Sequence, residues 1–117
     1  MSKHLELGRE GEALAVKHLE ENGYHILDRN YRFKHLELDI VCEKDNTLVI
    51  VEVKTRTTRK LGEPYMISRA KQKQILKATT YYVQERGVDS EIRLDVIGII
   101  KNQFEVSLEH IEGAFVG

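Results

Sequence analysis

The chain has 117 residues, 41% of them hydrophobic, and a formal net charge of −1 at pH 7. This length supports one domain with a modest core, and the composition is too apolar for a disordered chain. The sequence has no apolar run long enough for a membrane span or a signal peptide, and the single Cys42 excludes an internal disulfide framework. We therefore expect residues 1–117 to form a single domain in a reducing, cytoplasmic environment.

The first predicted element is a helix over 5–22, ended by Gly23. When its residues are placed at 100° per residue, one arc of roughly 100° should face the core. The members of this arc are Leu5, Gly8, Glu12, Ala15, Val16 and Leu19. The sequence therefore predicts that Glu12 is a carboxylate on the buried side of the helix.

Three strands are expected next, over 24–33, 36–43 and 47–56. Asp45 and Asn46 predict a tight turn that joins the second and third strands into a hairpin. A loop over 57–64 precedes a second helix over 68–86, ended by Gly87. Two strands over 92–101 and 104–110 close the chain, and the alternation in the last one is typical of a half-exposed edge.

The predicted order is therefore α-β-β-β-α-β-β. A strand, helix, strand connection predicts that the third and fourth strands are parallel and joined by a right-handed crossover. The expected fold class is α/β, with a mixed sheet and flanking helices. In the second helix, the inward residues should be Gln72, Ile75, Leu76, Thr79, Tyr82 and Val83.

Charged residues recur on alternate positions of the predicted hairpin, and residues two apart in a strand share a face. In the second strand this places Glu37, Asp39 and Val41 on one face, opposite Leu36, Leu38 and Ile40. In the third strand one face carries Ile50, Glu52, Lys54 and Arg56. Pairing of the two strands then brings these acidic residues together, and Glu12 could point at the same place.

Several carboxylates in a partly buried position repel one another, and a hard divalent cation removes that repulsion. Mg²⁺ prefers one or two carboxylates together with waters and phosphate oxygens. A lysine beside the metal supplies positive charge for a phosphoryl transition state or orients the attacking water. The pattern Asp-x(12)-Glu-x-Lys of Asp39, Glu52 and Lys54 therefore indicates a metal-dependent phosphodiesterase site. Taken alone, Glu52 and Lys54 are better interpreted as a surface pair at a strand end, and Asp39 in register with them shifts the balance to a catalytic site.

The net charge conceals a strongly basic segment. Between Lys54 and Lys77 the chain carries eight basic residues and one acidic residue, a net charge of +7, and the remainder carries −8. A charge run is often only a solvated surface, but this one begins at the proposed site and could bind phosphates. The candidate nucleic-acid-binding residues are Lys54, Arg56, Arg59, Lys60, Arg69, Lys71 and Lys73.

The chain resembles the YraN family of small bacterial proteins over nearly its whole length. The resemblance rests on the segments GREGE at 8–12, GYHILDRNYR at 23–32, ELDIV at 37–41, VEVKTR at 51–56 and RLDV at 93–96. That family is similar to Holliday-junction resolvases and restriction endonucleases, the PD-(D/E)xK nucleases. The resemblance implies a restriction-endonuclease-like fold, with Asp39, Glu52 and Lys54 as metal-binding and catalytic residues.

The same resemblance extends to two helical residues and one backbone group. Glu12 matches a helix glutamate of the junction-resolvase branch, and Gln72 looks like a helix glutamine that assists the site in related nucleases. The expected metal ligands are Asp39, Glu52, the carbonyl of Val53, and Glu12. Leu36 stands where the family usually has glycine, and we expect it to face away from the carboxylates.

Several of these residues also have simpler interpretations. Glu12 could be a buried carboxylate held by an arginine, because an unpaired buried acid is costly. Glu37 could be an outer ligand or only a charge at the edge of the site, and Gln72 could be hydrogen-bonded at the core margin. Asp95 is expected to be a structural partner of Arg93. Cys42 is expected to be a small core residue, and none of the five histidines has metal-ligand spacing.

The first functional hypothesis is a Mg²⁺- or Mn²⁺-dependent endonuclease that acts on DNA, with branched or flapped DNA as one substrate class. Alternatives are a DNA-binding module without turnover and a protein-interaction partner of DNA-processing machinery. One chain carries one proposed site, so paired cuts would require a homodimer.

Overall fold

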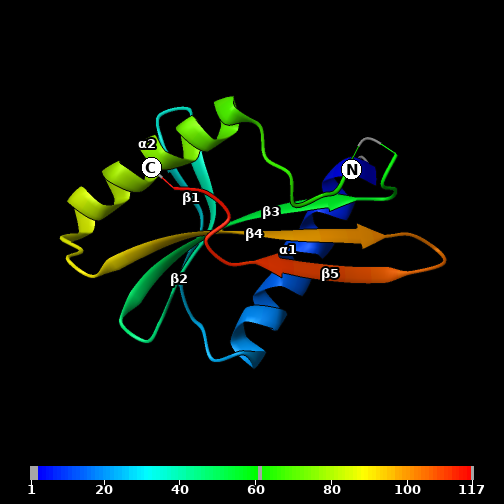
Figure 1. The fold of residues 1–117 in the computed structure, drawn as a ribbon, viewed down its shortest axis with the longest axis horizontal. Coiled ribbons are helices and arrows are strands. Elements are labelled where there is room, and N and C mark those ends of the chain that lie inside the picture. Colours follow the sequence, from blue (N-terminus) through cyan, green and yellow to red (C-terminus); the bar gives the residue numbers. More distant parts are fainter. Residues whose placement is uncertain (1–2, 61, 117) are drawn as a thin grey trace.

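The computed structural model describes residues 3–60 and 62–116, which form two helices and one five-stranded sheet (Figure 1). Residues 1, 2 and 117 of the expected domain, and residue 61 of the expected loop, lie outside this description. The elements are α1 (Lys3–Glu21), β1 (His25–Phe33), β2 (Leu36–Lys44), β3 (Thr47–Arg56), α2 (Arg69–Arg86), β4 (Glu91–Lys101) and β5 (Val106–Ile111). The predicted α/β class and element order are confirmed. Neither helix is long and apolar enough to cross a membrane.

The strands lie in the order β1-β2-β3-β4-β5, so consecutive strands are neighbours. The β3–β4 pair is parallel and the other three pairs are antiparallel, which confirms the predicted mixed sheet. The hairpin turn is also confirmed, because Asp45 and Asn46 have φ angles of 51° and 60°. Two successive left-handed residues are the signature of a type I′ turn, whose twist matches that of the two strands.

The helices cover opposite faces of the sheet (Figure 1), and each face has its own apolar cluster. On the α1 face the cluster includes Ala15, Leu19, Ile40, Cys42, Val49, Val51, Ile97 and Ile99. On the α2 face it includes Leu36, Leu38, Val41, Ile50, Ile75, Ala78, Tyr82 and Leu94. Cys42 is fully buried, as predicted for a core residue, and burial raises the pKa of its thiol to about 12.

The buried side of α1 is shorter than the sequence indicates. Gly11, Ala15 and Leu19 are buried, but Leu5 is 58% exposed and Gly8 is also exposed. The first turns of α1 do not pack on the sheet, because a cavity of about 810 Å³ lies between them and the end of β3. Of the predicted arc, Ala15 and Leu19 are buried and Glu12 and Val16 are half-buried, so it holds only from Glu12 onward.

Strand β5 begins two residues later than predicted. A turn occupies the region between Lys101 and Val106, and Phe104 in this turn is 87% exposed. The strand therefore does not extend to Phe104, although the alternation of apolar residues predicted that it would. The prediction that this strand is a half-exposed edge is confirmed.

The predicted alternation of β2 is wrong in its first half. Leu36 and Leu38 face α2, but Ile40 belongs to the α1 cluster and Val41 again faces α2. Leu36 therefore lies on the same face as Ile50, not away from it as expected. Glu37, between two residues that face α2, leaves the face on which the sequence placed it.

A left-handed residue in the neighbouring strand lies at the level of this change. Asn30 in β1 has a φ of 53°, and it lies opposite Asp39, since Arg29 pairs with Ile40 and Tyr31 pairs with Leu38. Strict alternation holds only for extended backbone, so one residue in the left-handed region shifts the faces of those beyond it. The shift therefore occurs at the same level in both strands.

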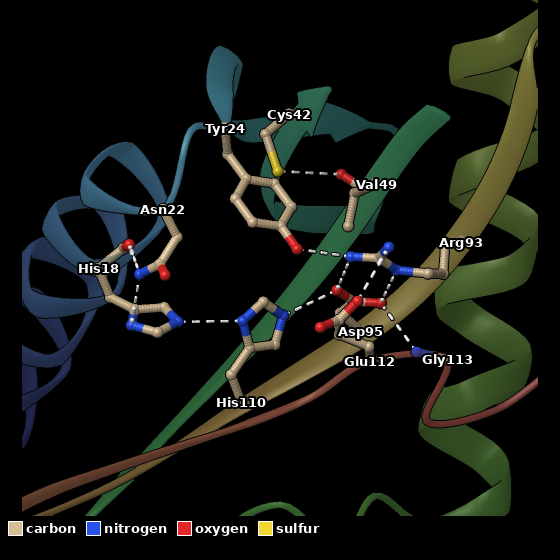
Figure 2. A network of polar contacts seen from close by, with 10 residues as sticks. All are labelled: His18, Asn22, Tyr24, Cys42, Val49, Arg93, Asp95, His110, Glu112 and Gly113. Atoms are coloured by element: carbon tan, nitrogen blue, oxygen red, sulfur yellow. Dashed lines mark hydrogen bonds and ion pairs between the residues drawn. The ribbon is translucent and has the colours of Figure 1, made fainter. Parts of the chain in front are cut away.

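Asp95 is the centre of a polar network on the α1 face (Figure 2). Its side chain is completely buried and accepts two hydrogen bonds from Arg93, both at 2.9 Å. It also accepts a hydrogen bond of 3.0 Å from the backbone N–H of Gly113 and lies 2.7 Å from Nε2 of His110. Burial alone would raise the pKa of Asp95, but these hydrogen bonds outweigh burial and lower it. The expected structural role of Asp95 with Arg93 is confirmed.

The network connects β4 and β5 to α1 and to Tyr24, the residue before β1. Nε2 of His18 in α1 lies 3.0 Å from Nδ1 of His110 in β5 (Figure 2). Because the Asp95 carboxylate only accepts, Nε2 of His110 carries a proton, and Nδ1 of His110 faces Nε2 of His18. Arg93 also donates to the Tyr24 hydroxyl at 2.6 Å. These bonds fix the last turn of α1 and the start of β1 against β4 and β5.

Replacement of Gly11 with alanine should destabilise the protein, whereas Gly8→Ala should not. A Cβ atom at Gly11 would lie 1.8 Å from Oγ1 of Thr55 and 2.8 Å from its Cβ, but one at Gly8 meets nothing within 4 Å. We expect Gly11→Ala to cost about 1–3 kcal/mol and Gly8→Ala to gain up to ~1 kcal/mol from helix propensity. Urea denaturation measures both, and equal effects would contradict the close α1–β3 contact.

The contribution of His18 to the stability of the protein should fall as the pH drops below about 6.5. Burial and the neighbouring His110 lower the pKa of His18, although Glu21 raises it. His18 therefore takes up its proton at a higher pH in the unfolded chain than in the folded chain, and between pH 7 and 5 this residue alone should add up to about one proton to those bound on unfolding. Denaturation curves across this range should show that His18→Gln changes the slope of stability against pH in favour of low pH relative to the wild type, and that the exposed His25→Gln does not. An unchanged slope in His18→Gln would contradict the assignment.

Candidate active site

The candidate site lies where β2 and β3 separate. The antiparallel ladder between these strands reaches Ile40 paired with Val51 and goes no further in that direction. Beyond it, Oδ2 of Asp39 accepts a hydrogen bond of 2.8 Å from the backbone N–H of Val53. A side chain thus takes over the role of a missing strand partner, and this contact brings the Asp39 carboxylate to β3.

Glu52 is a buried carboxylate beside Asp39. It lies one residue before Val53 on the face of Ile50, and it is only 7% exposed. Burial, the charge of Asp39 and a hydrogen bond between the two carboxyl groups raise the pKa of Glu52 to about 8. The predicted pairing of Asp39 with Glu52 therefore corresponds to a real contact.

Lys71 is the cation nearest to this pair. It belongs to the first turn of α2, which begins after the N-cap Ser68, and its Nζ lies 3.6 Å from Oε2 of Glu52. The Lys71 charge lowers the pKa of Glu52, but it does not offset burial and Asp39. The site therefore carries more negative charge than its own protein partners stabilise.

Lys54 follows Glu52 by two residues in a continuous part of β3, so both lie on the α2 face. It is half-buried and forms no ion pair within the described ranges 3–60 and 62–116. Its partner across the parallel ladder is Gly98, where an added Cβ would lie 2.9 Å from the backbone nitrogen of Tyr65 and 3.0 Å from Pro64. The absence of a side chain at 98 lets the loop after β3 pass close to Lys54.

Glu12 is placed elsewhere. Its Oε1 lies 3.2 Å from Nε of Arg29 and 3.0 Å from Nδ2 of Asn30, and the side chain is 15% exposed. Helix α1 covers the face opposite to Glu52, so Glu12 approaches the site only through Asn30, which lies opposite Asp39. Glu12 thus has the arginine partner of its simpler interpretation, and its assignment as a metal ligand stays a prediction.

Two further predicted residues have local partners. Gln72 donates from Nε2 to the carbonyl of Ile67 at 3.0 Å, at the entry to α2. Glu37 forms an ion pair of 3.5 Å with Arg32, its cross-strand partner in β1. Neither contact reaches Asp39 or Glu52, so both roles stay predictions.

The basic residues of the candidate DNA-binding surface differ in their surroundings. Arg59 is engaged by Glu105 at 2.9 Å and by Glu63 at 3.5 Å, and Lys71 is engaged by Glu52. Lys54 and Arg56 are half-buried at the end of β3. The exposed members of the set are Arg59, Lys60, Arg69 and Lys73, and the last three form no ion pair in the described ranges.

The predicted metal donors are only partly assembled. Within residues 3–60 and 62–116, no three His, Cys, Asp or Glu side chains gather closely enough to hold a metal ion. Asp39 and Glu52 form a pair, and Val53 places its backbone beside them. Oxygen donors of this kind suit Mg²⁺, which takes one or two carboxylates and keeps several waters.

Sequence analysis missed Lys71 as the partner of Glu52 and Asn30 as the partner of Glu12. A signal for Lys71 existed, because Ser68 predicts a helix start and places residue 71 in its first turn. Nothing in the local sequence identifies the left-handed backbone of Asn30, although asparagine tolerates that region better than most residues.

The fold and the site define a small α/β protein in which a mixed five-stranded sheet holds a carboxylate pair at the open end of a hairpin. Residues 11–99 match the family described as "Uncharacterised protein family UPF0102". The chain therefore belongs to the UPF0102 family, and the resemblance to YraN proteins is confirmed at this level.

Individual relatives match over nearly the whole chain. A UPF0102 protein of Christiangramia forsetii is 46% identical over 98% of both chains, and one of Flavobacterium psychrophilum is 43% identical over the same share. A UPF0102 protein of Geobacter metallireducens is 44% identical over 93% of this chain and 91% of its own length.

Replacement of Glu52 with glutamine should stabilise the protein at high pH in the absence of divalent cations. The folded pKa of Glu52 is raised from 4.5 to about 8, so its stabilising protonated form is complete below 4.5 and is lost as the pH rises through 8. At pH 9 we expect Glu52→Gln to exceed the wild type by about 2–4 kcal/mol in the free energy of unfolding.

Chemical denaturation in EDTA at pH 5 and pH 9 measures this difference. The exposed Glu109→Gln should leave the stability unchanged at both values. A Glu52→Gln protein that is less stable than the wild type at pH 9 would contradict the surplus negative charge of the site.

Proposed function

We propose that this protein is a metal-dependent endonuclease that hydrolyses DNA phosphodiester bonds. The single observation that carries this proposal is the buried contact between Asp39 and Glu52, with Lys54 two residues further along the same strand face. A purely structural ion pair would need a matching cation, and Lys71 alone does not offset this pair. A divalent cation would do so.

The residues present fit Mg²⁺ or Mn²⁺. Asp39, Glu52 and the Val53 carbonyl would hold the ion, and all three offer the oxygen ligands that hard cations prefer. A bound cation would supply charge neutralisation at the phosphate and lower the pKa of a coordinated water. The contact of Asp39 with the Val53 N–H holds one of its oxygens in place and leaves the other as a donor.

Lys54 is the proposed catalytic cation. It lies on the face of Glu52, is half-buried, and has no carboxylate partner in the described part of the chain. Its ammonium group would donate hydrogen bonds to a phosphate oxygen or to the attacking water. Pro64 and Tyr65 approach Gly98 closely, so the loop that carries them lies beside Lys54.

The exposed basic residues support DNA as the substrate. Lys60, Arg69 and Lys73 lie on the loop and helix that follow Lys54, and Lys71 lies at the site itself. Phosphate contacts by such residues supply sequence-independent affinity. The motif resemblance to restriction-endonuclease-like proteins and junction resolvases points the same way, and we extend it to a PD-(D/E)xK assignment of Asp39, Glu52 and Lys54.

A DNA-binding module without turnover is the second candidate. The position of Glu12, held by Arg29 and Asn30, favours it, because a third acidic ligand is then missing from the site. Such a module should bind DNA with a steep salt dependence and should not depend on Asp39.

Incubation of the purified protein with duplex, single-stranded and four-way-junction DNA, with and without Mg²⁺ or Mn²⁺, tests the proposal. We expect metal-dependent cuts that Asp39→Ala and Lys54→Ala abolish, with a loss of at least ~10²-fold in rate. Lys77→Ala, an exposed change on α2, serves as the matched control and should retain cleavage.

Metal binding gives a readout that is independent of cleavage. The cation should raise the melting temperature of the wild type, and Glu52→Ala should abolish that rise. Cuts that persist in the Asp39→Ala protein would indicate a contaminant and overturn the proposal. DNA binding without metal dependence would favour the module instead.

A further inference from the structure

Phe104 is an exposed aromatic residue at the tip of the turn between β4 and β5. Its side chain is 87% exposed, more than that of any other large hydrophobic residue described, and it precedes β5. One exposed apolar residue needs no explanation by itself. What distinguishes Phe104 is the order of the backbone that presents it.

The turn is held by the side chain of Asn102. The side-chain Oδ1 accepts hydrogen bonds from the backbone N–H groups of Phe104 at 2.8 Å and Glu105 at 3.0 Å. The backbone N–H of Asn102 donates to the Glu105 carbonyl at 3.0 Å. Three hydrogen bonds across four residues fix the direction in which the Phe104 side chain leaves the turn. The backbone that carries the ring is therefore already ordered before a ligand binds, which lowers the cost of binding.

The same turn is attached to the basic loop that follows β3. Nδ2 of Asn102 donates to the carbonyl of Thr57 at 2.9 Å. Arg59 donates to Glu105 at 2.9 Å and to the Ser107 hydroxyl at 3.1 Å. Because Arg56 pairs with Ile100 in the parallel ladder, β3 and β4 end side by side at the same end of the sheet, as Figure 1 shows.

These contacts give Arg59 a structural role. Its guanidinium is used by Glu63, Glu105 and Ser107, so it connects the loop to β5. Arg56 and Lys60 have no ion pair in the described ranges, and they flank the point where the turn is attached. This end of the sheet therefore combines two cations that form no ion pair in the described ranges, Arg56 and Lys60, with one exposed aromatic ring on an ordered turn.

We propose that Phe104 stacks on an unpaired base of a DNA strand whose phosphates contact Arg56 and Lys60. This inference rests on the proposed function, because it takes DNA as the ligand. Basic residues that follow the backbone, together with aromatic rings on which bases stack, are the two components of single-strand binding. The faces of bases inside a duplex are already stacked, so only an unpaired base can receive the ring. The preferred substrate class is therefore DNA with a single-stranded flap, fork or overhang next to the cut.

Binding of fluorescently labelled DNA in EDTA tests this proposal without cleavage. The probes are one duplex, the matching single strand, and the same duplex with an unpaired flap. Phe104→Ala should weaken binding of the single strand and flap roughly 5- to 100-fold, the effect of one lost stacked base, with little change for the duplex. Phe104→Trp should restore binding.

Matched variants separate stacking from charge and from general surface changes. Val106→Ala, which also removes an exposed apolar side chain from this hairpin, should bind like the wild type. Phe104→Ala should keep the salt slope of the wild type, whereas Lys60→Ala should reduce it by about 0.7 for single strands. A 2-aminopurine base in the flap should be quenched by the wild type and not by Phe104→Ala.

The outcomes distinguish this inference from the proposed function. If Phe104→Ala binds each of the three probes as tightly as the wild type does, the role of Phe104 is overturned and the nuclease proposal stays intact. The same holds if Phe104→Ala loses as much affinity for the duplex as for the flap. Flap binding that depends on Phe104 in a protein that never cuts DNA would support the stacking role and overturn the nuclease proposal.

Discussion

The contact between Asp39 and Glu52 is the constraint around which this end of the protein is built. Two carboxyl groups in contact, one of them buried, are unfavourable unless a proton or a cation lies between them. Three features of the chain create the contact: the separation of β2 from β3, the hydrogen bond from Val53, and the burial of Glu52 under the start of α2. A fold that needed only stability would gain by replacing one of these acids, and this conflict between local stability and sequence is typical of functional positions.

A second buried carboxylate on the same sheet shows what a satisfied acid looks like in this protein. Asp95 pairs with Val51, one residue before Glu52, but it faces α1 instead of α2. Four hydrogen-bond contacts lower its pKa, whereas the pKa of Glu52 is raised. The two environments are separated by the thickness of one sheet, so the difference comes from their partners and not from burial.

The sequence was sufficient for features that depend on local pattern. Periodicity and turn residues placed both helices, all five strands and the hairpin turn at Asp45, and the Asp-x(12)-Glu spacing placed two acids in contact. It failed where the backbone departs from regular alternation, as in β2 between Leu38 and Ile40, at the level of the left-handed Asn30 in β1. It also could not distinguish a lysine or arginine that binds a neighbouring acid, such as Lys71 or Arg59, from one that is available to a ligand, because such pairs form between distant segments.

The segment that follows β3 is anchored at three points: Thr57 to Asn102, Arg59 to Glu105, and Pro64 with Tyr65 against Gly98. These contacts restrain the described parts of the segment, 57–60 and 62–65, more than the mobile lids of many enzymes are restrained. For the proposed nuclease, closure around a substrate would then depend on the shape of the substrate, and selectivity would depend on which DNA structures reach the carboxylates past this restrained segment.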